Sequence, residues 1–230
     1  MLSSVVELGR VVCRVAYHIW YSFRMPTPAI ATSALQLKVI LLRSKPPIWR
    51  RVKVPSTMNL GQFHMVIQVA FGWTNSHLHD FTIEGETYGP VDVFGDTIDD
   101  VPPLSERSTK LSKVLGWAGA KARYTYDFGD GWDHEIVVEK VTQLSDELPL
   151  PLCTDGKRRC PPEDCGGIYG YYKLLEALTD LNHDEHDDLL EWVGGKLINP
   201  VEFSIEAAND DLSSLRKKPG TKKASEGKAN

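Results

Sequence analysis

The sequence lacks long apolar runs and has only 4 cysteines. Arg10 and Arg14 interrupt the one apolar stretch near its start. We therefore expect neither a membrane span, which needs about 20 apolar residues, nor a secretory signal peptide. Without export, the cysteines are expected to be reduced thiols in a cytoplasmic protein.

The signatures of several enzyme classes are also missing. The sequence has no G-x-S-x-G elbow, Walker loop, H-E-x-x-H pair or C-x-x-C knuckle, and no internal repeat. It therefore gives no basis for a serine hydrolase, a P-loop nucleoside triphosphatase, a zinc protease of that kind or a zinc ribbon.

The net charge of −5 is unevenly distributed along the chain. Residues 1–30 contribute +2 and residues 211–230 contribute +4, which leaves −11 for residues 31–210. A body this acidic repels phosphate backbones, so nucleic-acid association is expected only through local basic groups. Such groups are the lysine-rich end and a cluster formed by Arg50, Arg51 and Lys53.

Apolar residues make up 42% of the chain, which is typical of a soluble globular protein. Strand-like and helical patterns are mixed without regular strand–helix–strand alternation. This predicts one α+β domain over residues 35–207, with a mixed or antiparallel sheet packed against several helices. We expect an amphipathic helix and linker over residues 1–34, with Met25 as an alternative start, and a disordered basic tail over residues 208–230.

Local signals predict several element boundaries. Asn59 followed by Gln62 indicates a helix N-terminus, and Gly72 indicates the end of that helix. Residues 77–85 alternate as a strand, whereas residues 145–167, rich in proline, glycine and cysteine, are expected to form a loop.

The segment YTYDFGDGWDHEIVVEK, residues 124–140, predicts a β-hairpin with its turn at GDG. A period of two places Trp132 and His134 on the apolar face. The aspartates fit turn and solvent positions. A buried His134 needs a polar partner, and either a carboxylate or a metal ion would serve.

Histidines form one candidate metal set. His77 and His79 are expected on the same side of one strand, about 6–7 Å apart. If the hairpin packs beside that strand, His134 or Asp130 completes a site for zinc or manganese. The alternative is that backbone and carboxylate groups satisfy these histidines.

Cysteines form a second candidate set, for structural zinc. Cys153, Cys160 and Cys165 are separated by six and four residues. Together with His134 they would supply the four ligands of a tetrahedral zinc site.

Several segments follow one another in an order that points to a known family. They are LLRSKPPIWRRVKVP, FHMVIQVAFGWTNSHLHDFTI, YTYDFGDGWDHEIVVEK and CPPEDCGGIYGYYKLLEAL, followed by LEWVGG and PVEF. In this order they resemble the plasmid pRiA4b ORF-3-like family over about residues 35–207. The resemblance implies a small α+β protein without an established activity, sometimes labelled as a passenger protein of insertion elements.

Many of the motif positions that the resemblance marks are polar, which a fold alone rarely requires. We expect eight of them to frame a pocket: Trp49, Arg50, Trp73, Asp127, Asp130, Trp132, Glu163 and Asp164. In this interpretation the three tryptophans line a groove.

The first functional hypothesis is a binding or accessory module associated with mobile elements, whose partner is a protein or a component of such an element. The alternative is a metal-dependent phosphoester hydrolase with His77, His79 and His134 as ligands and Asp127 or Asp130 as ligand or base. A second alternative is nucleic-acid association through the basic tail.

Overall fold

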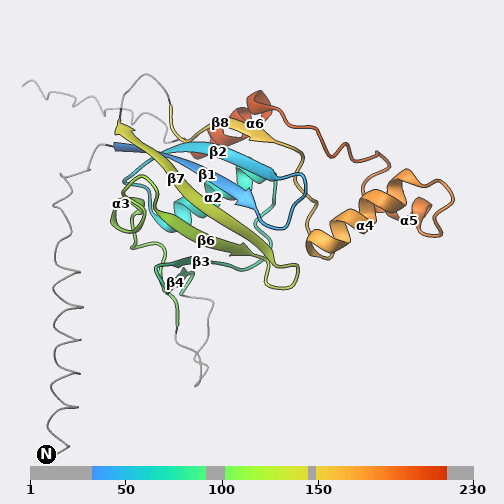
Figure 1. Ribbon diagram of the computed structural model, residues 1–230, viewed down its shortest axis with the longest axis horizontal. Coiled ribbons are helices and arrows are strands. Elements are labelled where there is room, and N and C mark those ends of the chain that lie inside the picture. Colours follow the sequence, from blue (N-terminus) through green and yellow to red (C-terminus); the bar gives the residue numbers. More distant parts are fainter. Residues whose placement is uncertain (1–32, 92–101, 145–148, 217–230) are drawn as a thin grey trace, which may run out of the picture. The chain divides into compact units, whose positions relative to one another are not determined.

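The computed structural model describes residues 33–91, 102–144 and 149–216 (Figure 1). The helix expected within residues 1–34 and the last part of the expected tail lie outside these ranges. No helix within them has both the length and the apolar character that a membrane span requires.

The described strands form one eight-stranded sheet in the order β5-β4-β3-β6-β7-β1-β2-β8. Neighbouring strands are antiparallel except β4 and β5, which are parallel. The strands are β1 (Ser33–Leu41), β2 (Ile48–Pro55), β3 (His79–Ile83), β4 (Glu86–Gly89), β5 (Leu104–Ser105), β6 (Lys121–Tyr126), β7 (Trp132–Gln143) and β8 (Leu152–Lys157).

Helices complete the predicted α+β architecture, which is confirmed. The helices are α2 (Leu60–Phe71), α3 (Leu111–Val114), α4 (Gly167–Thr179), α5 (His186–Trp192) and α6 (Ile205–Leu212), followed by the 3-10 turn η1 (Ser213–Leu215). Helix α2 covers one face of the sheet and α6 lies beside it near β8 (Figure 1).

Helix α2 begins and ends where the local signals predict. The Asn59 side chain accepts a hydrogen bond from the Gln62 amide at 2.8 Å, and the Gln62 side chain accepts one from the Asn59 amide at 3.1 Å. Gly72 ends the helix in the left-handed conformation, with φ of 81°, which glycine adopts without steric cost. The buried face of α2, which includes Phe63 and Ile67, packs into the core.

Two expected irregular segments are ordered, so the sequence prediction was wrong there. Strand β8 lies inside the expected loop 145–167 and pairs with β2. Helix α6 and η1 occupy the first residues of the expected tail. Asn209 on α6 accepts a hydrogen bond from the Cys153 amide and donates one to the Cys153 carbonyl, both at 2.8 Å, and Leu212 is completely buried. These contacts fix α6 against β8.

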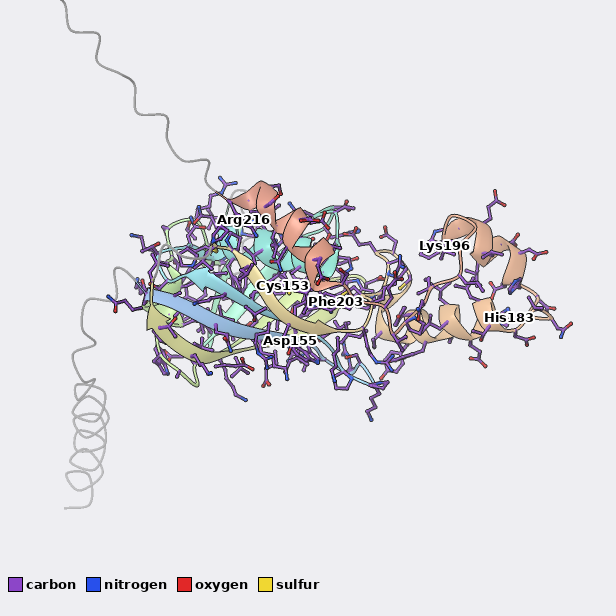
Figure 2. All side chains as sticks on the ribbon, turned by 90° about the horizontal axis from the view of Figure 1, so that it is seen from above. Cys153, Asp155, His183, Lys196, Phe203 and Arg216 are labelled. Atoms are coloured by element: carbon purple, nitrogen blue, oxygen red, sulfur yellow. The ribbon has the colours of Figure 1, made fainter. Side chains whose placement is uncertain are left out.

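Helices α4 and α5 form a hairpin beside the sheet (Figures 1 and 2). His186 at the start of α5 is buried, and its Nδ1 lies 2.9 Å from the Ala177 carbonyl oxygen of α4. The loop 193–204 returns from this hairpin to α6. The segment 161–166, which precedes α4, therefore joins the hairpin to the body of the domain.

Candidate functional site

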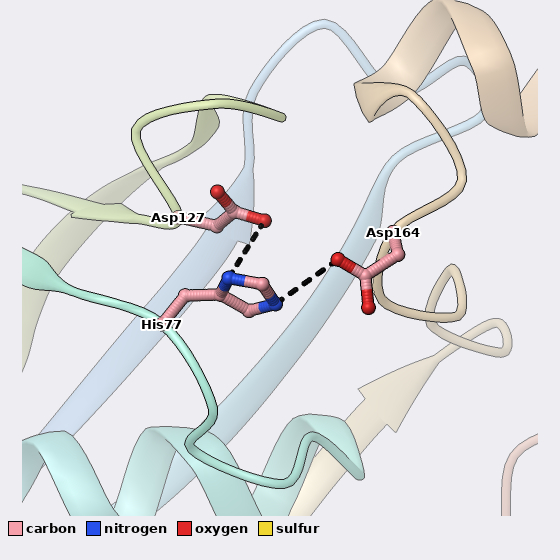
Figure 3. A group of neighbouring side chains, drawn as sticks. All are labelled: His77, Asp127 and Asp164. Atoms are coloured by element: carbon pink, nitrogen blue, oxygen red, sulfur yellow. Dashed lines mark ion pairs between the residues drawn. The ribbon is translucent and has the colours of Figure 1, made fainter.

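His77 lies between two carboxylates that come from distant parts of the chain (Figure 3). Its Nδ1 is 3.6 Å from Asp127 Oδ2, and its Nε2 is 3.1 Å from Asp164 Oδ1. One ligand atom from each of these residues lies within 4.8 Å of the others, and no other such group occurs among the described residues. We call this set the His77 cluster.

Both aspartates of the His77 cluster have an unusual backbone conformation. Asp127 and Asp164 have φ of 56° and 60°, a region that residues other than glycine rarely adopt. At Asp127 the side chain offsets this cost, because its Oδ1 accepts hydrogen bonds from the amides of Gly129 and Asp130 at 2.9 and 3.3 Å. Its Oδ2 remains directed at the imidazole.

A second polar group adjoins the His77 cluster. Glu163 accepts hydrogen bonds from the Thr74 amide at 3.0 Å, from the Thr74 hydroxyl at 2.6 Å and from the Tyr126 hydroxyl. Burial alone would raise the pKa of Glu163, but these hydrogen bonds outweigh it and the pKa is lowered. Burial, followed by Glu163, raises the pKa of Tyr126. We call Glu163, Thr74 and Tyr126 the Glu163 network.

Two more contacts tie segment 161–166 to the body. The Trp73 indole N–H donates to the Pro161 carbonyl at 3.0 Å, and the Gly166 amide donates to Asp130 Oδ2 at 3.2 Å. At Gly167 a Cβ atom would come within 2.3 Å of the Asp130 carbonyl oxygen. A side chain does not fit there, so this glycine permits the close approach of the two segments.

The three histidines of the predicted metal set do not come together. His79 Nε2 lies 2.7 Å from Glu106 Oε2, and the His79 ring stacks on His64 with 3.4 Å between centroids. His77 precedes β3 instead of lying in it, because its amide and that of Ser76 donate to the Tyr126 hydroxyl. Backbone pairing of β3 therefore begins only at His79, and the expected strand geometry does not hold at His77.

His134 points into the core, as the period of two predicts, but among the described residues no carboxylate pairs with it and it belongs to no group of metal-ligating side chains. It is completely buried, and neither ring nitrogen has a partner at hydrogen-bond geometry, although the backbone groups of Tyr124 and Trp132 lie near enough to act against the effect of burial on its pKa. Its ring meets Phe71 and Trp73 edge-on, with centroids 4.9 and 5.4 Å away. Burial lowers the pKa of His134 to about 4, so this imidazole is neutral at physiological pH.

The expected groove between three tryptophans is not formed. Trp73 and Trp132 are buried with ring centroids 5.8 Å apart. Trp49 lies on the opposite face of the sheet, because the alternation along β2 turns it outward and Arg50 inward. There Lys38 and Arg51 lie over the Trp49 ring.

The predicted basic cluster is also divided between the two faces of the sheet, because Arg50 and Arg51 are adjacent on β2. Arg50 is only 3% exposed, and Arg51 is paired with Glu139 at 2.6 Å and with Asp155 at 2.7 Å. Neither arginine therefore supports the predicted association with nucleic acid through this cluster.

The cysteines do not form the predicted zinc site. Cys153, Cys160 and Cys165 all lie in the described part of the chain, and their thiols do not gather into a ligand set there. Burial raises the pKa of Cys160 and of Cys165 to about 12 in each case. Both groups are thiols at physiological pH, which disfavours metal binding and nucleophilic attack.

Sequence reasoning missed Glu106, Thr74 and Tyr126 as polar partners. Glu106 is almost completely buried, and no local signal in the sequence around it points to His79. Tyr126 lies on the buried face of β6, and the period of two does not show which groups its hydroxyl contacts.

Comparisons with known proteins agree with the order of the motifs. The sequence pattern of the plasmid pRiA4b ORF-3-like protein family matches residues 33–208. The chain is 38% identical over 190 residues to the uncharacterized protein y4hQ of Sinorhizobium fredii, covering 80% of this chain and 94% of that one. It also resembles the crystal structure of MM3350, a protein of unknown function from Methanosarcina mazei, with a TM-score of 0.66, 34% identity and coverage of 76% and 97%. This chain therefore belongs to the plasmid pRiA4b ORF-3-like family.

Proposed function

We propose that this chain is a non-enzymatic binding module. The observation that carries the proposal is that the polar motif residues are each other's partners: Glu163 is held by Thr74 and Tyr126, and Asp130 by Gly166. These bonds hold segment 161–166, and with it the start of the α4–α5 hairpin, on the body. Such a network stabilises a fixed arrangement of binding surfaces and activates no group for catalysis.

The side chains around the Glu163 network are poorly suited to nucleophilic chemistry. The raised pKa values of Cys160 and Cys165 keep both sulfurs protonated. The lowered pKa of Glu163 makes it a weak base, and efficient general bases have a pKa near the working pH. The phosphoester hydrolase built on His77, His79 and His134 loses its basis, because these three imidazoles have separate surroundings.

Hydrolysis of bis(p-nitrophenyl) phosphate in the presence of Mn²⁺ or Zn²⁺ tests this proposal. We expect the protein to release no more nitrophenol than the metal ion alone. Saturable turnover by the wild type that disappears in His77→Gln, but persists in His183→Gln on the α4–α5 hairpin, would overturn it.

A second candidate function, divalent cation binding, is favoured by the geometry of the His77 cluster. His77 Nε2 is enclosed and has no hydrogen-bond partner, although Asp164 Oδ1 is 3.1 Å away. When Nδ1 carries the proton toward Asp127, the lone pair of Nε2 faces a carboxylate oxygen. A cation between them removes this repulsion, and two ligands of one zinc or manganese ion are typically about 3.0–3.3 Å apart. Asp127 would then orient the metal-binding imidazole.

Calorimetric titration with Mn²⁺ and Zn²⁺ tests the cation site. The wild type should bind about one ion per chain, and His77→Gln and Asp164→Asn should each weaken binding by about tenfold or more. Asp187→Asn, on the exposed surface of α5, is the matched control and should bind as the wild type does. Equal affinity in all four proteins would exclude the His77 cluster as the site.

We further propose a cytoplasmic location and a partner that is a protein or a component of a mobile element. The absence of a membrane-spanning helix in the described ranges is compatible with this location. We also propose that the domain runs from residue 33 to residue 216; β1 begins at Ser33, and Leu212 of α6 and Leu215 of η1 pack against the core, which supports these bounds. Fractionation of cells that express the tagged chain tests the location.

A further inference from the structure

A cleft of about 840 Å³ lies on the face of the domain that carries α6. Its walls are the last turn of α2, residues 159–162, the end of α5 with the loop that follows it to residue 198, residues 202–204 and the first turns of α6. Apolar side chains, including Trp192, Leu197 and Phe203, share these walls with charged ones. Figure 2 shows Phe203 close to β8 and Lys196 on the segment that follows α5. This volume is in the range of small-molecule sites.

Arg50 reaches this cleft from β2 and is buried without a carboxylate partner in the described part of the chain. Its Nε donates to the Ala70 carbonyl at 2.8 Å, and its Nη1 donates to the carbonyls of Trp49 and Lys157. The guanidinium carbon lies 4.0 Å from the centre of the Phe203 ring. Nη2 has no hydrogen bond and is not among the enclosed polar atoms. Two N–H groups therefore remain for a ligand.

The charge of Arg50 is only partly balanced by its surroundings. The C-terminal end of α2, where Ala70 lies, contributes about half a negative charge. Burial lowers the pKa of Arg50, as expected for a cation without a paired anion. A buried cation normally has an anionic partner, because removing it from water is costly.

The other charges on the cleft walls leave the balance positive. Glu202 is already paired with Arg159 at 3.1 Å. Lys196 has no ion pair within the described ranges, and the exposed Asp211 is the one unpaired carboxylate on these walls. Among the side chains, Arg50 and Lys196 together thus exceed Asp211 by one positive charge, and the end of α2 offsets about half of it.

We propose that this cleft binds a small organic monocarboxylate, with its carboxylate on Arg50 Nη2 and its apolar part against Phe203, Leu197 and Trp192. The inference names a ligand class for the binding module proposed above and rests on that proposal. A single negative charge is closer to the imbalance of the cleft than the two charges of a phosphate dianion, which would leave excess negative charge near Glu202 and Asp211. An apolar body matches the remaining walls, because burial of apolar surface supplies most of the binding free energy.

Titration with 3-phenylpropionate and octanoate tests the ligand class, with binding followed by nuclear magnetic resonance. Their neutral amides and inorganic phosphate are titrated in parallel. We expect both carboxylates to bind, and the amides and phosphate to bind at least about tenfold more weakly, because a charge-assisted hydrogen bond is lost or an excess charge is introduced. Equal binding of acid and amide, tighter binding of phosphate, or no carboxylate binding at millimolar concentration would each overturn the proposal.

Variants locate the ligand in the cleft. Arg50→Lys removes the free Nη2 group, and Arg51→Lys, its neighbour on the outer face of β2, is the matched control. Lys196→Glu reverses a charge at an exposed position, so the result does not depend on folding of the Arg50 variant; Lys173→Glu on α4 is its control. We expect about tenfold weaker binding in Arg50→Lys and in Lys196→Glu and no change in either control.

The same loss in a control as in its cleft variant would contradict the assigned position. A negative result in these titrations would overturn the carboxylate proposal and leave the binding-module proposal in place. The hydrolysis assay detects catalysis, whereas these titrations detect only the ligand.

Discussion

Replacement of His134 by leucine should stabilise the protein, and more so at lower pH. His134 lies on the central strand β7, completely buried between aromatic rings, with both ring nitrogens unpartnered. Leucine has nearly the same volume and no polar atoms. Volume-conserving substitution of a buried, unpaired polar group removes its desolvation cost without creating a cavity.

The magnitude follows from the contacts of the ring. A buried polar group without a partner costs about 1–3 kcal/mol, and leucine removes two such groups. The variant also loses the edge-on contacts with Phe71 and Trp73, which contribute about 0.5–1.5 kcal/mol each. The midpoints of these two ranges leave an increase of about 2 kcal/mol in the free energy of unfolding at pH 7.5, where the unfolded histidine is also neutral.

Lower pH should increase the difference in the free energy of unfolding between the leucine variant and the wild type. Burial lowers the pKa of His134 from 6.5 to about 4. Between these values the unfolded chain binds a proton that the folded protein excludes, so the stability of the wild type falls as the pH is lowered through this window. At pH 5 the loss is about 2 kcal/mol, since each pKa unit corresponds to about 1.4 kcal/mol. Leucine does not titrate, so the gap should widen by the same amount.

Urea denaturation followed by tryptophan fluorescence at pH 7.5 and pH 5 measures both differences. His64, whose pKa burial also lowers to about 4, is common to both proteins and cancels. Asn182→Ala, at an exposed position of the α4–α5 hairpin, removes no titratable group; it is the control and should show no widening. A leucine variant that is less stable than the wild type at pH 5, or a gap that does not change with pH, would refute the burial of an unpartnered, neutral His134.

Three further predictions concern the packing of α6, the N-terminal cap of α2 and the thiols of Cys160 and Cys165. Leu212→Ala should lower the free energy of unfolding by about 2–5 kcal/mol, because it removes a completely buried side chain of α6; unaltered denaturation would contradict the packing of α6. Asn59→Ala should cost about 1 kcal/mol in the same assay through loss of the capping box, and no cost would argue against that cap. Cys160 and Cys165 should react with iodoacetamide only slowly at pH 7.5, since burial raises both pKa values to about 12; peptide mapping that finds fast labelling of Cys160, which is buried, in the native protein would contradict this.

The sequence predicted the parts of the fold that depend on local signals. The ends of α2 follow from Asn59 and Gly72, whose roles depend on adjacent backbone groups. The β6–β7 hairpin and the inward direction of Trp132 and His134 follow from a period of two. Such features need no knowledge of distant contacts.

Elements formed by long-range contacts were not predicted. Strand β8 has the sequence LCTDGK, with little apolar alternation, and becomes a strand by pairing with the edge of β2. Helix α6 is rich in polar residues, and its position depends on Asn209 and the buried Leu212. In both segments tertiary contacts determine the structure and local propensity does not.

The sequence identified the residues of the candidate site but not which of them lie together. His77, Asp127 and Asp164 were all identified as site residues, and the structure brings them together. His79 was grouped with His77 because strand geometry was extended two residues too far. Its actual partner, Glu106, is 27 residues away in sequence, a separation that no periodicity can detect.

A double-mutant cycle between Tyr126→Phe and Glu163→Gln most directly tests our central claim, that the polar motif residues are mutual partners in a binding scaffold. The free energy of unfolding of the wild type, both single variants and the double variant gives their coupling. We predict a favourable coupling of at least about 1 kcal/mol, because the hydroxyl donates to an ionised carboxylate. Strictly additive effects would show that the two groups do not depend on each other and would contradict the claim.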